Sequence, residues 1–303
     1  MGKVENLKSR IWVELDTFDY VYRIGEYIMH HLLRLTDYSK KEFNEIYSIA
    51  DKIASKQYKD FLRGKTVVMF FPNNSIRTRV TFEKGIHLLG GQTILFPTET
   101  LDKKEELRDV IGYLNNWADL IIIRHKDITV LETIARYSNV PVINAMTDEN
   151  HPCEVLSDVY ALSKMREDFT KDKFLFCGEN GNIGKAWKEA SDVWGFELDQ
   201  CCAKGYEIKG LNAYYNIEDA IVGKDIICTD SLPAECLKIF SKCQVTKTAM
   251  DKANKGAILN PCPPFYRGEE VSADVIDSEY FVGYDFKKYL LEVQQAIIVY
   301  CLS

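Results

Sequence analysis

The sequence predicts an α/β protein made of two doubly wound parallel-sheet domains that are joined by a long helix. Three observations indicate this fold. Short apolar runs rich in branched and aromatic residues alternate with segments of helical apolar spacing along most of the chain. The alternation occurs twice, on either side of a long helical pattern near the middle. The length of 303 residues also exceeds what one hydrophobic core usually fills.

The first half alternates helices and strands after a polar opening. Each expected strand is a short apolar run, and each expected helix has apolar residues three or four positions apart. In chain order these are a helix at 39–57, a strand at 64–71, a helix at 78–91, a strand at 92–96, a helix at 105–117, a strand at 119–125, a helix at 128–138 and a strand at 140–145. Strands joined by helices in this way form a parallel sheet covered on both faces.

A helical pattern at 151–167, with Pro152 in its first turn, connects the halves. Beyond it we expect strands at 173–178, 196–202, 211–216, 224–230 and 256–261, and helices at 183–195 and 290–302. No Pro- or Gly-rich linker separates the halves. We therefore expect a first domain at 1–150 and a second at 151–285 that begins with the connecting helix, while the final helix, at about 286–303, packs back on the first domain.

Composition excludes several classes of protein. The net charge is −7 with scattered Lys and Arg, so a nucleic-acid partner is not expected. There is no run of eighteen apolar residues and no apolar leader at the start, so we expect neither a membrane span nor export, but a cytoplasmic protein. The odd number of cysteines without CxxC spacing indicates reduced thiols in the core. They are residues 153, 177, 201, 202, 228, 236, 243, 262 and 301.

The turn after the first expected strand carries the groups of a phosphate site. It supplies two hydroxyls, a guanidinium and helix N-terminal amides, from Ser75, Ile76, Arg77 and Thr78. A helix N-terminus and a bidentate guanidinium both bind tetrahedral anions. The alternative is that Ser75 only caps the helix while Arg77 and Arg79 are solvated.

Two further strand ends carry polar residues, Arg124 with His125 and His151 with Glu154. A histidine alone is more often structural than catalytic, and that alternative stays open for His151. Because the carboxyl ends of parallel strands meet at one edge of a sheet, these side chains can converge with Arg77 on one small ligand.

These motifs resemble those of the aspartate/ornithine carbamoyltransferase family. The segments are SIRTR (75–79), RH (124–125) and HPCE (151–154), and the resemblance runs from about residue 31 to the C-terminus. It implies a site for carbamoyl phosphate, whose phosphate is held by Ser75, the amide of Ile76, Arg77, Thr78 and Arg124. It also implies that Thr78, Arg124 and His151 reach the carbonyl oxygen, and it gives these three residues the catalytic role.

This sequence departs from the family pattern at two of these positions. Ile76 replaces a threonine, which is harmless if only its amide is used. Glu154 replaces a glutamine that hydrogen-bonds the carbamoyl NH2, and a carboxylate can still accept that bond.

The segment NPCPPFYRGEEV (260–271) resembles the aspartate-type form of the family. The resemblance implies that the carbonyls of Pro261 and Cys262 bind the carbamoyl nitrogen, and Arg267 is expected at the second substrate. The charged segment at 98–106 lies where aspartate-type enzymes insert a lysine into the neighbouring subunit's site. Lys103 or Lys104 would act there in trans, and a solvated loop is the alternative.

The glycine-rich turn at 176–186 admits two interpretations. Gly178, Gly181 and Gly184 suggest a dinucleotide site and an NAD-dependent oxidoreductase. The GxGxxG form is absent, however, and the following strand does not end in the carboxylate that would bind a ribose. The ornithine-type members instead imply that Asn182 and Asp230 bind the amino-acid end of the acceptor.

The ornithine-type resemblance is incomplete at two places. The SMG that follows the aspartate in ornithine-type members is missing, and whether Ser231 substitutes for it stays open. The final helix also has no arginine at the ornithine-type position.

Together these features predict a carbamoyltransferase of amino-acid and arginine metabolism, acting on ornithine or a related amine without a metal or organic cofactor. Positioning and oxyanion stabilisation would provide most of the catalysis. Aspartate as acceptor, or a catalytically silent binding protein, are the alternatives. The family resemblance further implies a homotrimer or a multiple of it.

Overall fold

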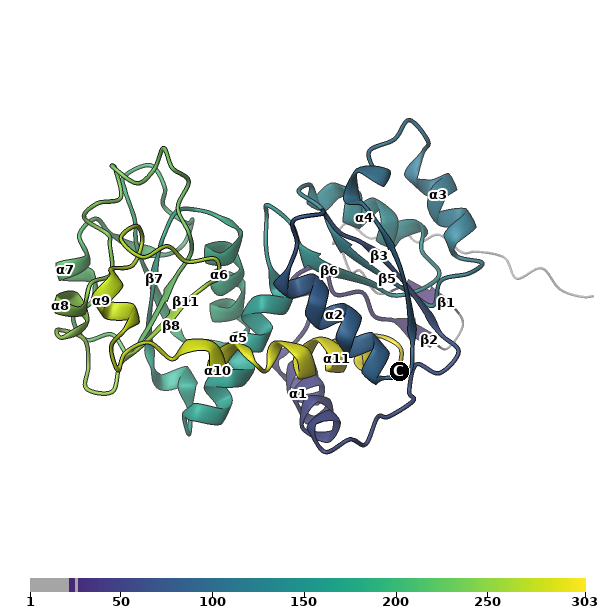
Figure 1. The fold of residues 1–303 in the computed structure, drawn as a ribbon, viewed down its shortest axis with the longest axis horizontal. Coiled ribbons are helices and arrows are strands. Elements are labelled where there is room, and N and C mark those ends of the chain that lie inside the picture. The colour runs from purple at the N-terminus through teal and green to yellow at the C-terminus, as the bar shows by residue number, and fades with distance from the viewer. Residues whose placement is uncertain (1–21, 25–26) are drawn as a thin grey trace, which may run out of the picture.

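The computed structural model describes residues 22–24 and 27–303, and Figure 1 shows them as two α/β lobes lying side by side. The first lobe is built on a four-stranded parallel sheet, in the order β4-β3-β5-β6. Its strands are β3 (Thr66–Phe70), β4 (Gln92–Phe96), β5 (Leu120–Arg124) and β6 (Val142–Met146). Residues 1–21 of the expected first domain lie outside the described part of the chain.

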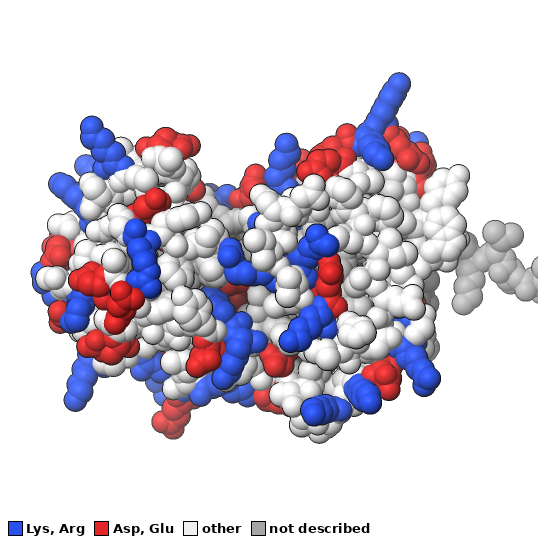
Figure 2. Space-filling view, viewed as in Figure 1, with Lys and Arg blue, Asp and Glu red and all other residues white. Residues whose placement is uncertain are grey.

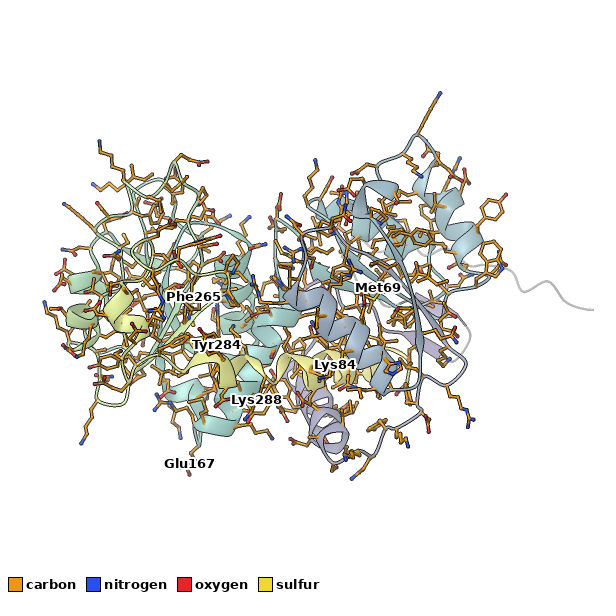
Figure 3. All side chains as sticks on the ribbon, in the orientation of Figure 1. Met69, Lys84, Glu167, Phe265, Tyr284 and Lys288 are labelled. Carbon is orange, nitrogen blue, oxygen red and sulfur yellow. The ribbon has the colours of Figure 1, made fainter. Side chains whose placement is uncertain are left out.

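Helices cover both faces of this sheet, as the alternation of apolar patterns predicts. They are α1 (Lys40–Ala54), α2 (Arg77–Leu88), α3 (Leu107–Leu114) and α4 (Ile128–Tyr137), with 3₁₀ turns η1 (Leu35–Asp37) and η2 (Thr98–Thr100). A short antiparallel pair, β1 (Tyr22–Ile24) and β2 (Tyr27–Met29), precedes them. Helix α1 begins with a capping box between Ser39 and Glu42. Met69 of β3, labelled in Figure 3, is fully buried in the core.

The second lobe is built on a five-stranded parallel sheet, in the order β11-β10-β7-β8-β9. Its strands are β7 (Lys173–Cys177), β8 (Glu197–Cys201), β9 (Asn212–Tyr214), β10 (Ile226–Thr229) and β11 (Ile258–Pro261). The main helix is α6 (Asn182–Trp194). The other helical elements of this lobe are short: η3 (Phe169–Lys171), α7 (Ile217–Ala220), α8 (Lys247–Met250), α9 (Ala273–Ile276) and α10 (Gly283–Lys287). The predicted fold class, two parallel-sheet α/β domains, is confirmed.

Two helices run between the lobes, α5 (Pro152–Met165) and α11 (Leu290–Cys301). Helix α11 contacts α1, α2 and α5, so the C-terminus lies in the first lobe (Figure 1). The close approach of α11 to α2 requires Gly85, since a Cβ there would lie 2.9 Å from Gln295 Cγ. Gln295 Nε2 donates to the Gly85 carbonyl at 3.0 Å. Along these helices, one continuous cluster of buried apolar side chains extends through both lobes.

Each sheet has a switch point, a place where the chain leaves one strand for its neighbour on one side and later returns to its neighbour on the other side. In the first sheet it lies between β3 and β5, and in the second between β7 and β10. Ligands of open α/β sheets bind at the carboxyl ends of strands beside such points. The topology thus selects the turn after β3, the end of β5, and the ends of β7 and β10.

The surface visible in Figure 2 carries both positive and negative charges, without a large patch of one sign. Figure 2 shows basic and acidic side chains interspersed over both lobes on the face in view. Among the described residues, no helix is long and apolar enough to cross a membrane.

Candidate active site

The turn between β3 and α2 presents an open helix N-terminus. Ile76 occupies the N-cap position, and no side chain accepts a hydrogen bond from the first turn of α2. Ser75 does not cap the helix. Its side chain is buried, and its Oγ accepts a hydrogen bond of 3.1 Å from Arg124 Nη1. The apolar side chain of Ile76 is 69% exposed, and its carbonyl accepts a hydrogen bond from the Val80 N–H. The backbone N–H is therefore the group that Ile76 can offer to a polar ligand.

Two guanidiniums stand at this switch point. Burial lowers the pKa of Arg124, and the nearby Arg77 lowers it further. Within the described part of the chain neither arginine forms an ion pair with a carboxylate. Two cations held close together beside a helix N-terminus form a site for a doubly charged anion.

The end of β6 delivers His151 to the same place. His151 precedes α5 directly; its side chain is buried, and its Nδ1 has no hydrogen-bond partner among the described residues. Burial lowers the pKa of His151 to about 4, with Arg124 and Lys287 adding to the effect and Glu154 opposing it. The imidazole is therefore neutral near pH 7 and can donate one hydrogen bond to a developing oxyanion. Thr78, in the first turn of α2, is also buried.

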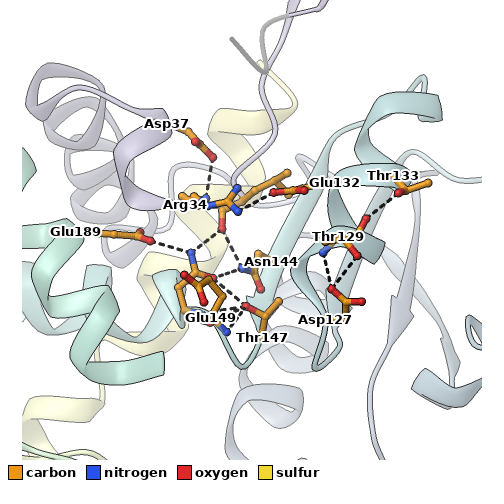
Figure 4. Close-up of polar contacts among 12 residues, drawn as sticks. Arg34, Asp37, Asp127, Thr129, Glu132, Thr133, Asn144, Thr147, Glu149 and Glu189 are labelled. Atoms are coloured by element: carbon orange, nitrogen blue, oxygen red, sulfur yellow. Dashed lines mark hydrogen bonds and ion pairs between the residues drawn. The ribbon is translucent and has the colours of Figure 1, made fainter. Parts of the chain in front are cut away.

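Segment 147–150, which leads to His151, is held by hydrogen bonds to both lobes (Figure 4). Asn144 Nδ2 donates to Asn150 Oδ1 at 2.7 Å, and Asn150 Nδ2 donates to Glu189 Oε1 of α6 at 3.1 Å. Glu189 Oε2 accepts the Leu35 N–H at 2.8 Å. Burial of the Glu189 carboxyl raises its pKa to about 7.

The same face of α6 makes two further contacts with this segment. Asn182 Nδ2 donates to the Thr147 carbonyl at 2.7 Å, and Lys185 pairs with Glu149 at 2.8 Å. Positions 182, 185 and 189 lie on one face of a helix. The contacts fix the second lobe against the segment that positions His151.

A buried ion cluster lies on α5, within two turns of His151. Glu154 and Asp158 lie one turn apart on α5, and Lys287 of α10 contacts both, at 2.9 Å from Glu154 Oε1 and 2.7 Å from each Asp158 oxygen. Asn260 Nδ2 donates to Asp158 Oδ2 at 2.9 Å. Burial opposes ionisation of Glu154, but Lys287 and His151 outweigh it and hold the pKa of Glu154 below its usual range. Burial raises the pKa of Asp158 to about 6. Position 154 therefore holds a charged carboxylate.

The aligned strands of the second sheet end in the remaining site residues. Cys177 pairs with Thr229, and Thr229 with Pro261, so Asp230 and Cys262 follow neighbouring strand ends. Burial raises the pKa of Asp230 to about 7, with Glu270, Glu179 and Glu154 contributing. The Cys262 thiol is buried, and burial raises its pKa well above its usual range, so it is not poised as a nucleophile.

Three further predicted residues have exposed side chains. Lys103 and Lys104 are exposed in the loop after β4, whose base is tied down by a 3.0 Å contact between Asp102 and His125 Nε2. Arg267 is exposed and forms an ion pair with Asp277 at 2.9 Å. The assignment of Arg267 to the second substrate stays a prediction.

Sequence reasoning missed the ion cluster. The signal for half of it was present, because Glu154 and Asp158 are i, i+4 carboxylates in an otherwise apolar helix. Nothing in the sequence around Lys287 or Asn260 indicates that either residue reaches them.

Comparison with known proteins decides the family. Residues 30–164 match the model of the aspartate/ornithine carbamoyltransferase carbamoyl-P binding domain, and residues 171–301 match that of the Asp/Orn binding domain. The chain belongs to the aspartate/ornithine carbamoyltransferase family. The prediction of an enzyme that transfers a carbamoyl group from carbamoyl phosphate is confirmed at the level of this family. The two family models meet at the end of α5, between residues 164 and 171.

Named relatives of this carbamoyltransferase cover nearly its whole length. It is 31% identical over 298 residues to the ornithine carbamoyltransferase of Chromobacterium violaceum. This match covers 90% of this chain and 97% of the relative. It is 32% identical to that of Herminiimonas arsenicoxydans, over 89% and 96% of the two chains. The crystal structure of ornithine carbamoyltransferase from Burkholderia thailandensis superposes with a TM-score of 0.83 at 28% identity, covering 90% of this chain and 98% of that one. The Pyrococcus furiosus enzyme gives 0.82 at 29%, covering 89% and 96%.

Proposed function

We propose that this carbamoyltransferase moves the carbamoyl group of carbamoyl phosphate to the amine of ornithine or a related amine, at a site built from strand ends of both sheets. The observation that carries the proposal is the pair Arg77 and Arg124. Among the described residues neither guanidinium has a carboxylate partner, and both lie beside an open helix N-terminus. Arg77 acts electrostatically on Glu154, and Arg124 acts on His151.

The proposed carbamoyl phosphate site draws on three strand ends. Its phosphate is bound by Ser75, the Ile76 amide, Arg77, Thr78 and Arg124. The carbonyl oxygen receives hydrogen bonds from Thr78, Arg124 and His151, and the carbamoyl nitrogen donates to Glu154 and to the carbonyls of Pro261 and Cys262. Because Lys287 keeps Glu154 ionised, this carboxylate can accept a hydrogen bond from the NH2 as a glutamine oxygen would.

The reaction needs little acid–base machinery. The uncharged amine attacks the carbonyl carbon, the bond from that carbon to the phosphate oxygen breaks, and the departing phosphate takes the proton of the amine. Neutral His151 and cationic Arg124 stabilise the oxyanion that develops on the carbonyl oxygen. Asn182, Asp230 and Ser231 of the second lobe hold the far end of the acceptor.

The test is a panel assay of carbamoyl phosphate with ornithine, aspartate and simple amines, following both inorganic phosphate and the ureido product. Turnover with an amine supports the proposal and rejects a catalytically silent binding protein. Turnover with aspartate alone would replace it by the aspartate-type activity. Saturable NADH binding would revive the oxidoreductase alternative.

His151→Ala is expected to lower kcat by about 10²–10³ while carbamoyl phosphate still binds, because one oxyanion donor is lost and the phosphate contacts are kept. Steady-state rates and calorimetric titration separate the two effects. His87→Ala, at an exposed histidine of α2, is the control and should retain the wild-type kcat. An unchanged kcat in His151→Ala would make His151 a structural residue.

We also propose that the enzyme assembles as a homotrimer through the face formed by α2 and β4. Strand β4 is an edge strand, and apolar side chains on this face are exposed to 69% at Ile76, 57% at Val80 and 47% at Ile94. Monomeric proteins rarely leave an apolar edge uncovered. The loop with Lys103 and Lys104 follows β4 directly and would reach the neighbouring subunit.

A mixture of two inactive chains tests this assembly. Refolding Arg77→Ala chains together with chains carrying Lys103→Ala and Lys104→Ala should restore activity, because some hybrid trimers contain one site built from intact parts. Each variant alone should stay inactive. Light scattering should give a mass near three times 34.9 kDa. A fully active monomer, or no recovery in verified hybrids, would contradict the shared site.

We propose that the protein is cytoplasmic, because its cysteines form no disulfide bonds. All nine are buried free thiols, which suits a reducing compartment.

A further inference from the structure

The buried ion cluster joins the two elements that would hold the carbamoyl nitrogen. Glu154 lies in the first turn of α5, and the carbonyls of Pro261 and Cys262 lie at the end of β11. Asn260, the residue before Pro261, donates to Asp158 Oδ2 at 2.9 Å. The cluster therefore ties the end of β11 to the start of α5.

The Lys287 ammonium is committed entirely to this cluster. Its Nζ lies 2.9 Å from Glu154 Oε1 and 2.7 Å from each carboxylate oxygen of Asp158. An ammonium has three N–H groups, so these contacts use all of them. All three side chains are largely buried, so water competes little for these bonds.

The contact with Lys287 makes the two oxygens of Glu154 different. Oε1 accepts the bond from Lys287, while Oε2 makes no hydrogen bond within the described part of the chain. Although Glu154 is a buried residue, its Oε2 is not sealed from solvent as Nδ1 of His151 is. The carboxylate is therefore held by one oxygen and offers the other as a hydrogen-bond acceptor.

We propose that Lys287 is a positioning residue that makes the site specific for carbamoyl phosphate over other acyl phosphates. The inference rests on the proposed function, in which Glu154 accepts a hydrogen bond from the carbamoyl NH2. Because Lys287 binds Oε1, Oε2 is the oxygen left for that NH2. An acyl phosphate with a methyl group in this place would cover Oε2 without giving it a partner, which costs free energy.

The arrangement gives the isosteric substitution Glu154→Gln a specific consequence. A glutamine has one oxygen, and the Lys287 ammonium can bond only to that oxygen, because the amide nitrogen is itself a donor. The amide NH2 would then face the carbamoyl NH2, donor against donor. Removing the ammonium frees the glutamine oxygen to turn toward the ligand. Adding Lys287→Met should therefore restore the specificity that Glu154→Gln alone loses.

Calorimetric titration with carbamoyl phosphate and with acetyl phosphate, which has a methyl group in place of the NH2, measures this specificity as the ratio of the two affinities. The wild type should prefer carbamoyl phosphate by about tenfold or more, the contribution of one charge-assisted hydrogen bond. Glu154→Gln should lower the ratio by about fivefold or more while acetyl phosphate still binds within about threefold of wild type. Glu154→Gln with Lys287→Met should return the ratio to within about threefold of wild type.

The matched control is Glu154→Gln with Lys288→Met. Lys288 is the next residue along the chain and is exposed, so this chain should keep the low ratio of Glu154→Gln. If Glu154→Gln with Lys287→Met does not fold, adding Asp158→Asn removes the remaining buried charge of the cluster. That triple variant should show the same restored ratio.

Three results would overturn the inference and leave carbamoyl transfer, which the amine panel measures separately, standing. They are an unchanged ratio in Glu154→Gln, equal ratios in Glu154→Gln with and without the removal of Lys287, and a parallel loss of both affinities in Glu154→Gln. A wild type that binds both acyl phosphates equally would overturn it as well. Absence of both carbamoyl phosphate binding and turnover in the wild type would overturn the inference together with the proposed function.

Discussion

Replacing Lys287 with methionine is expected to lower the free energy of unfolding by about 3–5 kcal/mol, the usual cost of removing one partner from a buried ion cluster. The Lys287 side chain is 18% exposed, and those of Glu154 and Asp158 are 8% and 3% exposed. Without the ammonium, two carboxylates one helical turn apart face each other in a site that excludes water. Urea denaturation of the wild type and the variant at the same pH measures the difference.

Lys288→Met provides the matched control. Lys288, labelled in Figure 3, is the next residue along the chain and is exposed. The same substitution there should change stability by no more than about 0.5 kcal/mol. Adding Glu154→Gln and Asp158→Asn to Lys287→Met should recover most of the loss, because no uncompensated charge remains buried. Equal stability of the Lys287 and Lys288 variants would show that the cluster contributes nothing.

Arg77→Ala is expected to abolish measurable carbamoyl phosphate binding or to weaken it by at least tenfold. A charge-assisted hydrogen bond contributes about 1.5–3 kcal/mol, which corresponds to roughly 10–150-fold in affinity. Arg77 lacks a carboxylate partner within the described chain, so its charge is free for the phosphate. Calorimetric titration with carbamoyl phosphate measures the loss.

Arg79→Ala is the control for this prediction. Arg79 lies two residues away in the same motif but forms an ion pair with Glu83 at 2.6 Å, so the variant should bind carbamoyl phosphate like the wild type. Affinity of Arg77→Ala within threefold of wild type would place the phosphate elsewhere.

The fold could be predicted from the sequence because each element carries its own periodic pattern. The strand at 92–96 and its neighbours are short apolar runs, and the long helices have regular apolar spacing. The four- and five-residue helices at 217–220, 247–250, 273–276 and 283–287 are too short to show such a period. The expected helices and strands are therefore present, while these short segments were missed.

Much of the candidate site could also be predicted. The sequence locates Ser75, Arg77, Arg124 and His151 at or just after strand ends, and parallel strands bring their carboxyl ends to one edge. Sequence alone could not order the strands, because strand order depends on which strands pair. The order β4-β3-β5-β6 is what makes the turn after β3 and the end of β5 neighbours.

Tertiary structure alone decided which partners the buried polar side chains have. Lys287 lies 133 residues from Glu154, and no local pattern records a contact over that separation. Likewise, the sequence identifies Asn182 as a candidate ligand, but only the packing of α6 against segment 147–150 commits one of its N–H groups to the Thr147 carbonyl. Local sequence determines periodicity and therefore which face of an element is buried. The partners of a buried charge or amide follow from which elements pack together, and that depends on the whole chain.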